Sequence, residues 1–118
     1  YKAKKVHVDG HIFDSKAEAK YYMELRTMER AGQLKVVALQ PKVYLTKARI
    51  LYKPDFLIEI DGDQYYIDVK GPFDNPRFAL KARLWRHYGP GTLWVVASDN
   101  FGSKKERHSL KGDENESD

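Results

Sequence analysis

The chain has 118 residues, the size of a single domain, and contains no cysteine, which excludes disulfides, zinc–thiolate sites and cysteine nucleophiles. No apolar run is long enough to span a membrane and no secretory signal is evident, so we expect a cytoplasmic protein. The net charge is +4, but residues 113–118 contain four acids and no base, so the first 112 residues carry +8. A body this basic favours a polyanionic partner such as nucleic acid, the alternative being a merely solvated surface.

The first elements in the chain are a short hairpin and a helix. Residues 6–13 predict the hairpin, because apolar residues flank an Asp-Gly pair that is typical of a type I′ turn. Ser15 is a good helix N-cap, and Glu18 completes a Ser-x-x-Glu capping box. The apolar residues that follow recur with helical spacing, and Gly32 ends this helix.

Extended segments follow the first helix. Residues 34–39 and 42–45 look like strands, and Pro41 between them argues against one uninterrupted central strand. Residues 51–60 and 63–69 predict the clearest hairpin in the chain, because a second Asp-Gly pair joins them.

The last part of the chain predicts a helix, a strand and a tail. Asn75 as N-cap and Pro76 at the first helical position begin a helix that runs to Tyr88, where a Gly-Pro-Gly sequence stops it. Residues 92–97 form an apolar run typical of a buried strand. Residues 100–118 are polar and charged, and we expect a flexible tail.

These elements predict one α/β domain over residues 1–99, with a mixed central sheet and a helix on each face. The second helix lies between two strands and can serve as the crossover that makes the last strand parallel to its neighbour.

The residues that indicate chemistry lie on the hairpin formed by 51–60 and 63–69. Asp68 and Lys70 are two residues apart, so their side chains share one face of a strand. With a two-residue turn, counting back along both strands places Asp55 directly opposite Asp68. Directly opposed residues share a face, with Cβ atoms about 4.5–5.5 Å apart. The sequence therefore predicts two carboxylates side by side on one surface.

Such a pair is unfavourable in a sheet unless a cation lies between its members. Like charges directly opposite destabilise a sheet, and Asp is a poor strand former. Mg²⁺ prefers one or two carboxylates and keeps several waters, which allows it to hold a phosphate oxygen and ready a water for attack. Lys70 would supply positive charge beside that water or the pentacovalent phosphate. The alternative is a solvated polar face on which Lys70 simply neutralises Asp68.

Pro54-Asp55 followed by Asp68-Val69-Lys70 resembles the signature of the PD-(D/E)XK nuclease superfamily, with Asp in place of the commoner Glu in the second motif. The core of that superfamily has the element order αβββαβ, which is similar to the order predicted over residues 15–97. The resemblance implies a restriction-endonuclease-like fold and Mg²⁺-dependent hydrolysis of DNA, with Mn²⁺ able to substitute. Residues 13–19 and 39–41 also resemble small phage proteins of this superfamily, and phage Holliday-junction resolvases share the core.

The resemblance also implies an acidic residue from the first helix, for which Glu18 is the best match. Asp55, Asp68 and Glu18 would then bind the metal, Glu18 directly or through water, and Lys70 would position the nucleophilic water. The alternative for Glu18 is the capping box alone. Glu24 is the fallback acid, although it lies on a different face of the helix.

Five basic side chains are candidates for contact with the DNA backbone: Lys4, Lys5, Lys53, Arg77 and Lys81. The first two belong to a basic N-terminal arm, the third precedes the Pro-Asp pair, and the last two are four residues apart on the second helix. A solvated helix face is the alternative for that last pair. Because so small a chain covers little DNA, we expect a homodimer that cuts two strands symmetrically.

The sequence therefore predicts a phage-derived, Mg²⁺-dependent DNA endonuclease that acts in the cytoplasm of a bacterial host on branched, recombination or replication DNA. A restriction-type, nicking or transposase-type enzyme is an alternative on the same core. A non-catalytic DNA-binding module and a protein–protein adaptor are alternatives of another class, against which the opposed carboxylates argue.

Overall fold

The computed structural model describes residues 5–70, 76–97 and 107–112. Its helices are α1 (Lys16–Arg30) and α2 (Pro76–Tyr88). Its strands are β1 (Val6–Val8), β2 (His11–Phe13), β3 (Lys35–Leu39), β4 (Val43–Leu45), β5 (Ile50–Tyr52), β6 (Phe56–Ile60), β7 (Asp63–Lys70), β8 (Thr92–Ala97) and β9 (Arg107–Lys111). Within these ranges, neither helix is both long and apolar enough to cross a membrane.

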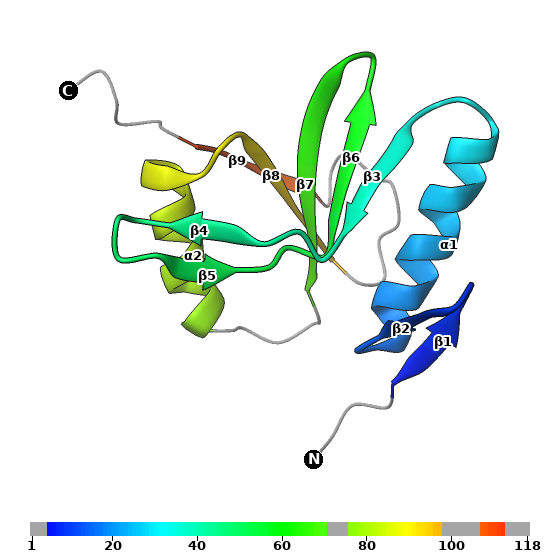
Figure 1. Ribbon diagram of the computed structural model, residues 1–118, viewed down its shortest axis with the longest axis horizontal. Coiled ribbons are helices and arrows are strands. Elements are labelled where there is room, and N and C mark those ends of the chain that lie inside the picture. The colour runs from blue at the N-terminus through cyan, green and yellow to red at the C-terminus, as the bar shows by residue number, and fades with distance from the viewer. Residues whose placement is uncertain (1–4, 71–75, 98–106, 113–118) are drawn as a thin grey trace.

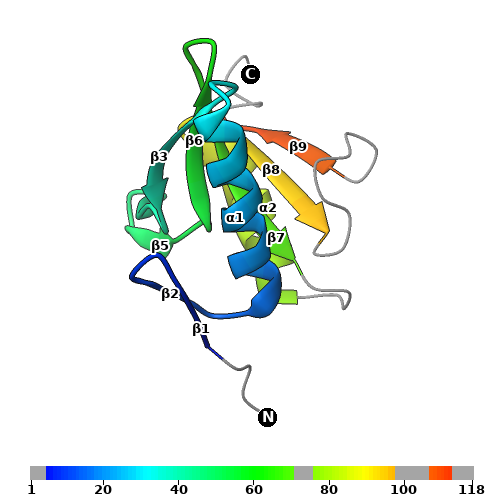
Figure 2. The same ribbon diagram turned by 90° about the vertical axis from the view of Figure 1, so that its right-hand side faces the viewer.

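The centre of the described fold is a five-stranded mixed sheet in the order β3-β6-β7-β8-β9. β7 and β8 run parallel, and the other neighbours are antiparallel. α2 connects the parallel pair, as predicted, because parallel strands need a crossover connection. α1 covers one face of the sheet and α2 the other (Figures 1 and 2). The predicted mixed α/β architecture is therefore confirmed.

The β6–β7 hairpin has the predicted register. Both residues of its turn have positive φ, 50° at Asp61 and 87° at Gly62, as a type I′ turn requires. The pairing runs without a shift from this turn to Phe56 and Ile67. A slip of one residue would move every side chain to the opposite face, so this local turn fixes which residues enter each core.

Each face of the sheet has its own hydrophobic cluster. The cluster under α1 includes Phe13, Tyr21, Tyr22, Leu25, Phe56, Ile58 and Ile67. The cluster under α2 includes Val43, Leu45, Tyr52, Trp85, Leu93 and Leu110. Phe78 and Ala82 pack against this second cluster, so the apolar stripe of α2 belongs to the core.

The prediction of one strand over residues 51–60 was wrong. The chain bends at Pro54, whose side chain is fully buried, and this bend separates β5 from β6. β5 pairs with β4 in a two-stranded sheet of its own, while β6 enters the central sheet. Proline cannot donate a ladder hydrogen bond, so it interrupts the strand. The β4–β5 hairpin is thus inserted between two neighbouring strands of the central sheet and lies against α2 (Figure 1).

The prediction of a tail was wrong for residues 107–111. They form β9, which pairs antiparallel with β8 at the edge of the sheet. Leu110 is the apolar residue of this strand, and it is buried in the cluster under α2. One apolar side chain gives no alternating pattern, so only the neighbouring strand and helix define this element. The remaining tail residues, 100–106 and 113–118, lie outside the described ranges.

Candidate functional site

Asp55 and Asp68 meet where β6 and β7 stop pairing. The last printed pair of the ladder is Phe56 with Ile67, and Asp55 and Asp68 are the next residues of each strand. The backbone N–H of Val69 donates to Asp55 Oδ2 at 2.7 Å, so a side chain replaces the missing backbone partner. The two carboxyl groups interact directly through hydrogen bonding and charge. The structure therefore brings together the pair that the register predicted.

The face that carries Asp68 is covered rather than exposed. Asp68 is only 5% exposed. The Tyr52 hydroxyl donates to its Oδ2, and Lys70 Nζ lies 3.2 Å from its Oδ1. Tyr52 comes from the inserted β4–β5 hairpin, and its ring packs edge-on against Trp85 of α2. The predicted open surface was wrong, because the hairpin and α2 together exclude solvent from this carboxylate.

Glu18 joins the pair from the first turn of α1. Its backbone N–H donates to the Ser15 side chain at 3.0 Å, which is the predicted N-cap. Its side chain is 6% exposed, accepts from Gln40 Nε2 at 3.4 Å and interacts with Asp55. The backbone of Glu18 thus serves the helix cap while its carboxyl group belongs to the acidic cluster. Glu24, the fallback, is exposed.

The electrostatics of this cluster reflect crowding of acids away from water. Burial, followed by the charges of Asp68 and Glu18, raises the pKa of Asp55 to about 9, against the lowering effect of the Val69 N–H. Burial is also the largest cause of the raised pKa of Glu18. Burial and the Asp68 charge raise the pKa of the Tyr52 hydroxyl. Without a cation, the cluster is stable only when it retains protons.

Lys70 lies between the buried carboxylates and solvent. Its side chain is 28% exposed, whereas that of Asp68 is 7% exposed. Its ammonium also lies 4.1 Å from the centre of the Phe78 ring, a cation–π contact. These two partners fix the positive charge at the mouth of the acidic cluster.

The residues fit a divalent cation through two carboxylates rather than a complete cage. No group of three or more His, Asp or Glu side chains within the described ranges is arranged to hold a metal ion. Mg²⁺, however, needs only one or two carboxylates and takes waters for its remaining positions. Asp55 and Asp68 supply hard oxygen donors whose mutual repulsion a cation would relieve.

Tyr52 and Gln40 are site residues to which sequence reasoning assigned no role. The backbone N–H of Gln40 donates to the Asp55 carbonyl at 2.8 Å, and its side chain donates to Glu18. Gln40 has a φ of 49°, so the chain turns sharply after β3 and directs this residue toward the acids. A polar residue between a strand and a proline was the available signal for Gln40. Nothing local marks Tyr52, whose partner is 16 residues away.

Three of the predicted DNA contacts lie near the site. Lys53 is exposed two residues before Asp55, and Arg77 is exposed at the start of α2. Lys81 Nζ donates to the Leu51 carbonyl at 2.8 Å, so it ties α2 to the β4–β5 hairpin. Lys81 therefore has a structural partner in addition to any role in binding.

The other two predicted contacts belong to the N-terminal arm. Lys5 forms an exposed ion pair with Asp14, with 3.2 Å between Nζ and Oδ1. An exposed pair of this kind contributes little to stability, so it leaves Lys5 able to exchange partners. Lys4 lies outside the described residues.

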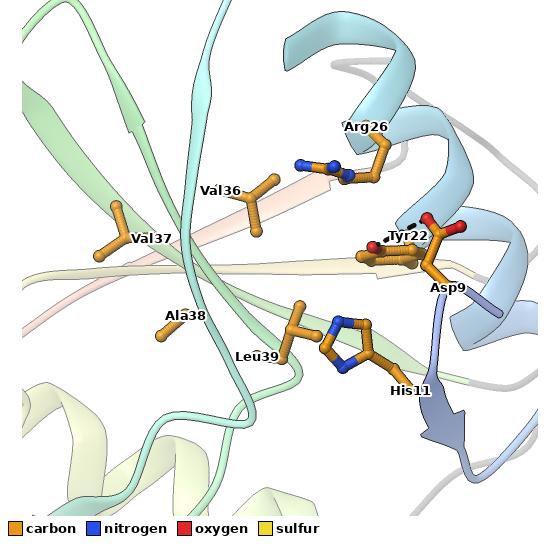
Figure 3. A pocket seen from close by; sticks show the side chains of 8 residues that line it. All are labelled: Asp9, His11, Tyr22, Arg26, Val36, Val37, Ala38 and Leu39. Atoms are coloured by element: carbon orange, nitrogen blue, oxygen red, sulfur yellow. Dashed lines mark hydrogen bonds between the residues drawn. The ribbon is translucent and has the colours of Figure 1, made fainter. Parts of the chain in front are cut away.

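A separate pocket of about 350 Å³ lies between α1, β3 and the β1–β2 hairpin (Figure 3). Its one carboxylate, Asp9, accepts a hydrogen bond from the Tyr22 hydroxyl at 3.1 Å. Arg26 and His11 also line it. Tyr22 is one helical turn from Glu18, but the pocket holds no second acid, so the carboxylate chemistry lies outside it.

A search of curated proteins gave no significant match. A family model described as "Protein of unknown function (DUF1064)" matches residues 1–103, a range that contains the acidic cluster, Lys70 and β8. The chain therefore belongs to the DUF1064 family.

Proposed function

We propose that this protein is a Mg²⁺-dependent DNA endonuclease of the PD-(D/E)XK superfamily. The observation that carries this proposal is the contact between Asp55 and Asp68 at the ends of two strands, beside Lys70. The element order supports it, because α1, β3, β6, β7, α2 and β8 follow the αβββαβ order of that superfamily. The β4–β5 hairpin is then an insertion into a restriction-endonuclease-like core, and β9 is an addition at its edge.

Each site residue has a distinct task in this proposal. Asp55 and Asp68 would hold Mg²⁺, with Glu18 as a further ligand, directly or through a water. When bound, Mg²⁺ polarises a phosphodiester oxygen and lowers the pKa of a bound water. Lys70 donates hydrogen bonds toward the attacking water or the phosphate and offsets the negative charge that develops there. Tyr52 holds the Asp68 carboxylate in place through its hydroxyl.

DNA is the proposed substrate because the first 112 residues carry +8. The likeness to small phage nucleases extends this proposal to branched, recombination or replication DNA in a bacterial host. A homodimer would place two acidic clusters on the two strands of such a substrate.

Cleavage of a four-way junction, a linear duplex and a single strand, each with and without Mg²⁺, tests this function. We expect the wild-type protein to cut at least one substrate, only with Mg²⁺ or Mn²⁺. Asp68→Asn and Lys70→Ala should each slow cleavage on the order of 100-fold or more. Lys35→Ala, which removes an exposed lysine at the far end of β3, should cleave at the wild-type rate. Equal activity of wild type, Asp68→Asn and Lys70→Ala would contradict the assignment.

A non-catalytic DNA-binding module is the second candidate, and one observation favours it. Both Asp68 oxygens already accept hydrogen bonds from groups of the chain, one from Tyr52 and one from Lys70. Such a carboxylate is satisfied without a metal ion. This candidate predicts that Mg²⁺ leaves the melting temperature unchanged and that no substrate is cut, although DNA still binds.

A further inference from the structure

We propose that the β4–β5 hairpin is a nucleic-acid-binding element that holds the phosphate backbone of the DNA strand beside the acidic cluster. This inference rests on the proposed function for the identity of the ligand and assigns its binding to residues outside the catalytic group.

Charge is concentrated on this hairpin. Residues 42–53 contain four bases and no acid, whereas the other 106 residues contain 17 bases and 17 acids. The first 112 residues carry +8, so a segment of 12 residues holds half of that excess. All four basic side chains are exposed: Lys42, Lys47, Arg49 and Lys53. A basic stripe of this kind is the electrostatic footprint of a nucleic-acid partner.

The outer face of the hairpin also presents apolar side chains. Tyr44 is 47% exposed, Leu51 is 39% exposed, and the two residues pair across the hairpin. The Arg49 guanidinium lies 4.3 Å from the centre of the Tyr44 ring. Aromatic side chains interleaved with cations bind nucleic acid through stacking on bases and ion pairs with phosphates. A hairpin that only kept the protein in solution would not need this exposed apolar surface.

The hairpin is fixed to the acidic cluster. Tyr52 bonds to Asp68, and Lys81 of α2 bonds to the Leu51 carbonyl. Its buried face packs Val43 and Leu45 into the cluster under α2. Any strand that contacts the outer face is therefore held at a set distance from the carboxylates.

The tip of the hairpin is held in one shape. The Arg49 N–H donates to the Thr46 carbonyl, and the Ala48 N–H donates to the Thr46 hydroxyl, each at 3.0 Å. Arg49 and Lys53 are four residues apart, about 13 Å along an extended chain, which is about four phosphate spacings of one strand of B-form DNA. A preordered tip loses little conformational freedom on binding.

A second copy of this chain is a poor occupant for this surface. In a symmetric dimer the same patch meets itself, so the four cations of one copy would face the four of the other. That repulsion favours a polyanion over self-association.

The test is DNA binding in the presence of EDTA, which separates binding from cleavage. Fluorescence anisotropy with a labelled four-way junction and a labelled duplex, at salt concentrations from about 50 to 200 mM, compares wild type with two double variants. Lys47→Ala/Arg49→Ala changes the hairpin tip. Arg30→Ala/Lys35→Ala is the matched control, because it removes two exposed charges far from the acidic cluster. Circular dichroism verifies that both variants fold.

We expect the hairpin variant to bind about 10- to 100-fold more weakly, with the slope of log affinity against log salt reduced by about 1–2. The control should lose less than about threefold. Tyr44→Ala, which removes a ring and no charge, should weaken binding without changing the salt slope.

Equal losses in the two double variants, or none in the hairpin variant, would overturn this inference, as would a wild type that binds neither DNA. The nuclease proposal fails separately. If the hairpin variant binds poorly but wild type never cuts with Mg²⁺, the hairpin stands and the nuclease falls. If cleavage requires Asp68 but the hairpin variant binds normally, the nuclease stands and the hairpin falls.

Discussion

The two faces of the central sheet are built from alternate residues of the same strands, yet their interiors differ in chemistry. Under α1, Phe56 and Ile67 are fully buried among aromatic and aliphatic neighbours. Under α2, Asp68 is almost as deeply buried, beside the apolar cluster of Trp85 and Leu93. Ile67 and Asp68 are adjacent in sequence, and strand alternation sends them to opposite faces.

This difference separates stability from chemistry. An apolar core is stabilised by removal of its surface from water and needs no ligand. A buried pair of carboxyl groups is stable only with a proton or a cation between its members. Substitutions on the α1 face should therefore change folding, and substitutions in the acidic cluster should change cation binding and cleavage.

The largest expected effect is on catalysis, from Asp68→Asn. We expect the cleavage rate with Mg²⁺ to fall on the order of 10³-fold, about 4 kcal/mol in the activation barrier. The free energy of unfolding should change by less than about 1 kcal/mol, because Asn keeps the shape of the side chain and one acceptor. Single-turnover rates and urea denaturation measure the two quantities. Activity lost only in proportion to the unfolded fraction would contradict the separation.

Ile67→Ala is the reciprocal test on the α1 face. We expect it to lower the free energy of unfolding by about 2–5 kcal/mol, because it leaves a cavity in the cluster that contains Phe56 and Tyr21. Per folded molecule, its cleavage rate should remain within about threefold of wild type. Urea denaturation gives the stability, and the rate is normalised to the folded fraction. A large loss of rate in fully folded protein would show that the two faces are coupled.

The third prediction concerns pH without added metal. The pKa of Asp55 is about 9 in the folded chain, against an ordinary value of 3.8, so the folded state binds more protons between these values. Stability therefore falls as pH rises from about 4 to about 9. Asp55→Asn should flatten this slope and be more stable than wild type at pH 8, by roughly 1–3 kcal/mol.

Melting curves of the two proteins at several pH values test this prediction. Glu18 contributes to the slope in the same direction in both, so their difference isolates Asp55. Mg²⁺ should raise the melting temperature of wild type more at pH 8 than at pH 6, because protons compete with the cation. An identical pH slope in the two proteins would contradict the proposed burial of this charge.

The smallest expected effect comes from Tyr52→Phe. It removes the hydroxyl that donates to Asp68 but retains the ring that packs on Trp85. We expect a loss of about 1 kcal/mol in the free energy of unfolding. As a positioning residue, Tyr52 should affect kcat by a few-fold and leave KM for DNA unchanged. A change in KM alone would instead assign the hydroxyl to substrate binding.

Local signals in the sequence determined the register of the main hairpin and the start of α1. An Asp-Gly turn requires positive φ at both residues, and this requirement fixes the pairing from the turn to Phe56 and Ile67. From that register alone, Asp55 had to lie opposite Asp68. Ser15 marked the N-cap for a similar reason, because its side chain satisfies a backbone N–H three residues away.

Only the tertiary structure decided what surrounds that pair. Tyr52 reaches Asp68 because Pro54 bends the chain and the β4–β5 hairpin packs on α2. Gln40 reaches Glu18 across 22 residues, and β9 exists because β8 offers it an edge. Turns, caps and alternation act over a few residues and are therefore legible in sequence. Contacts between distant elements depend on where the chain returns, which no local pattern encodes.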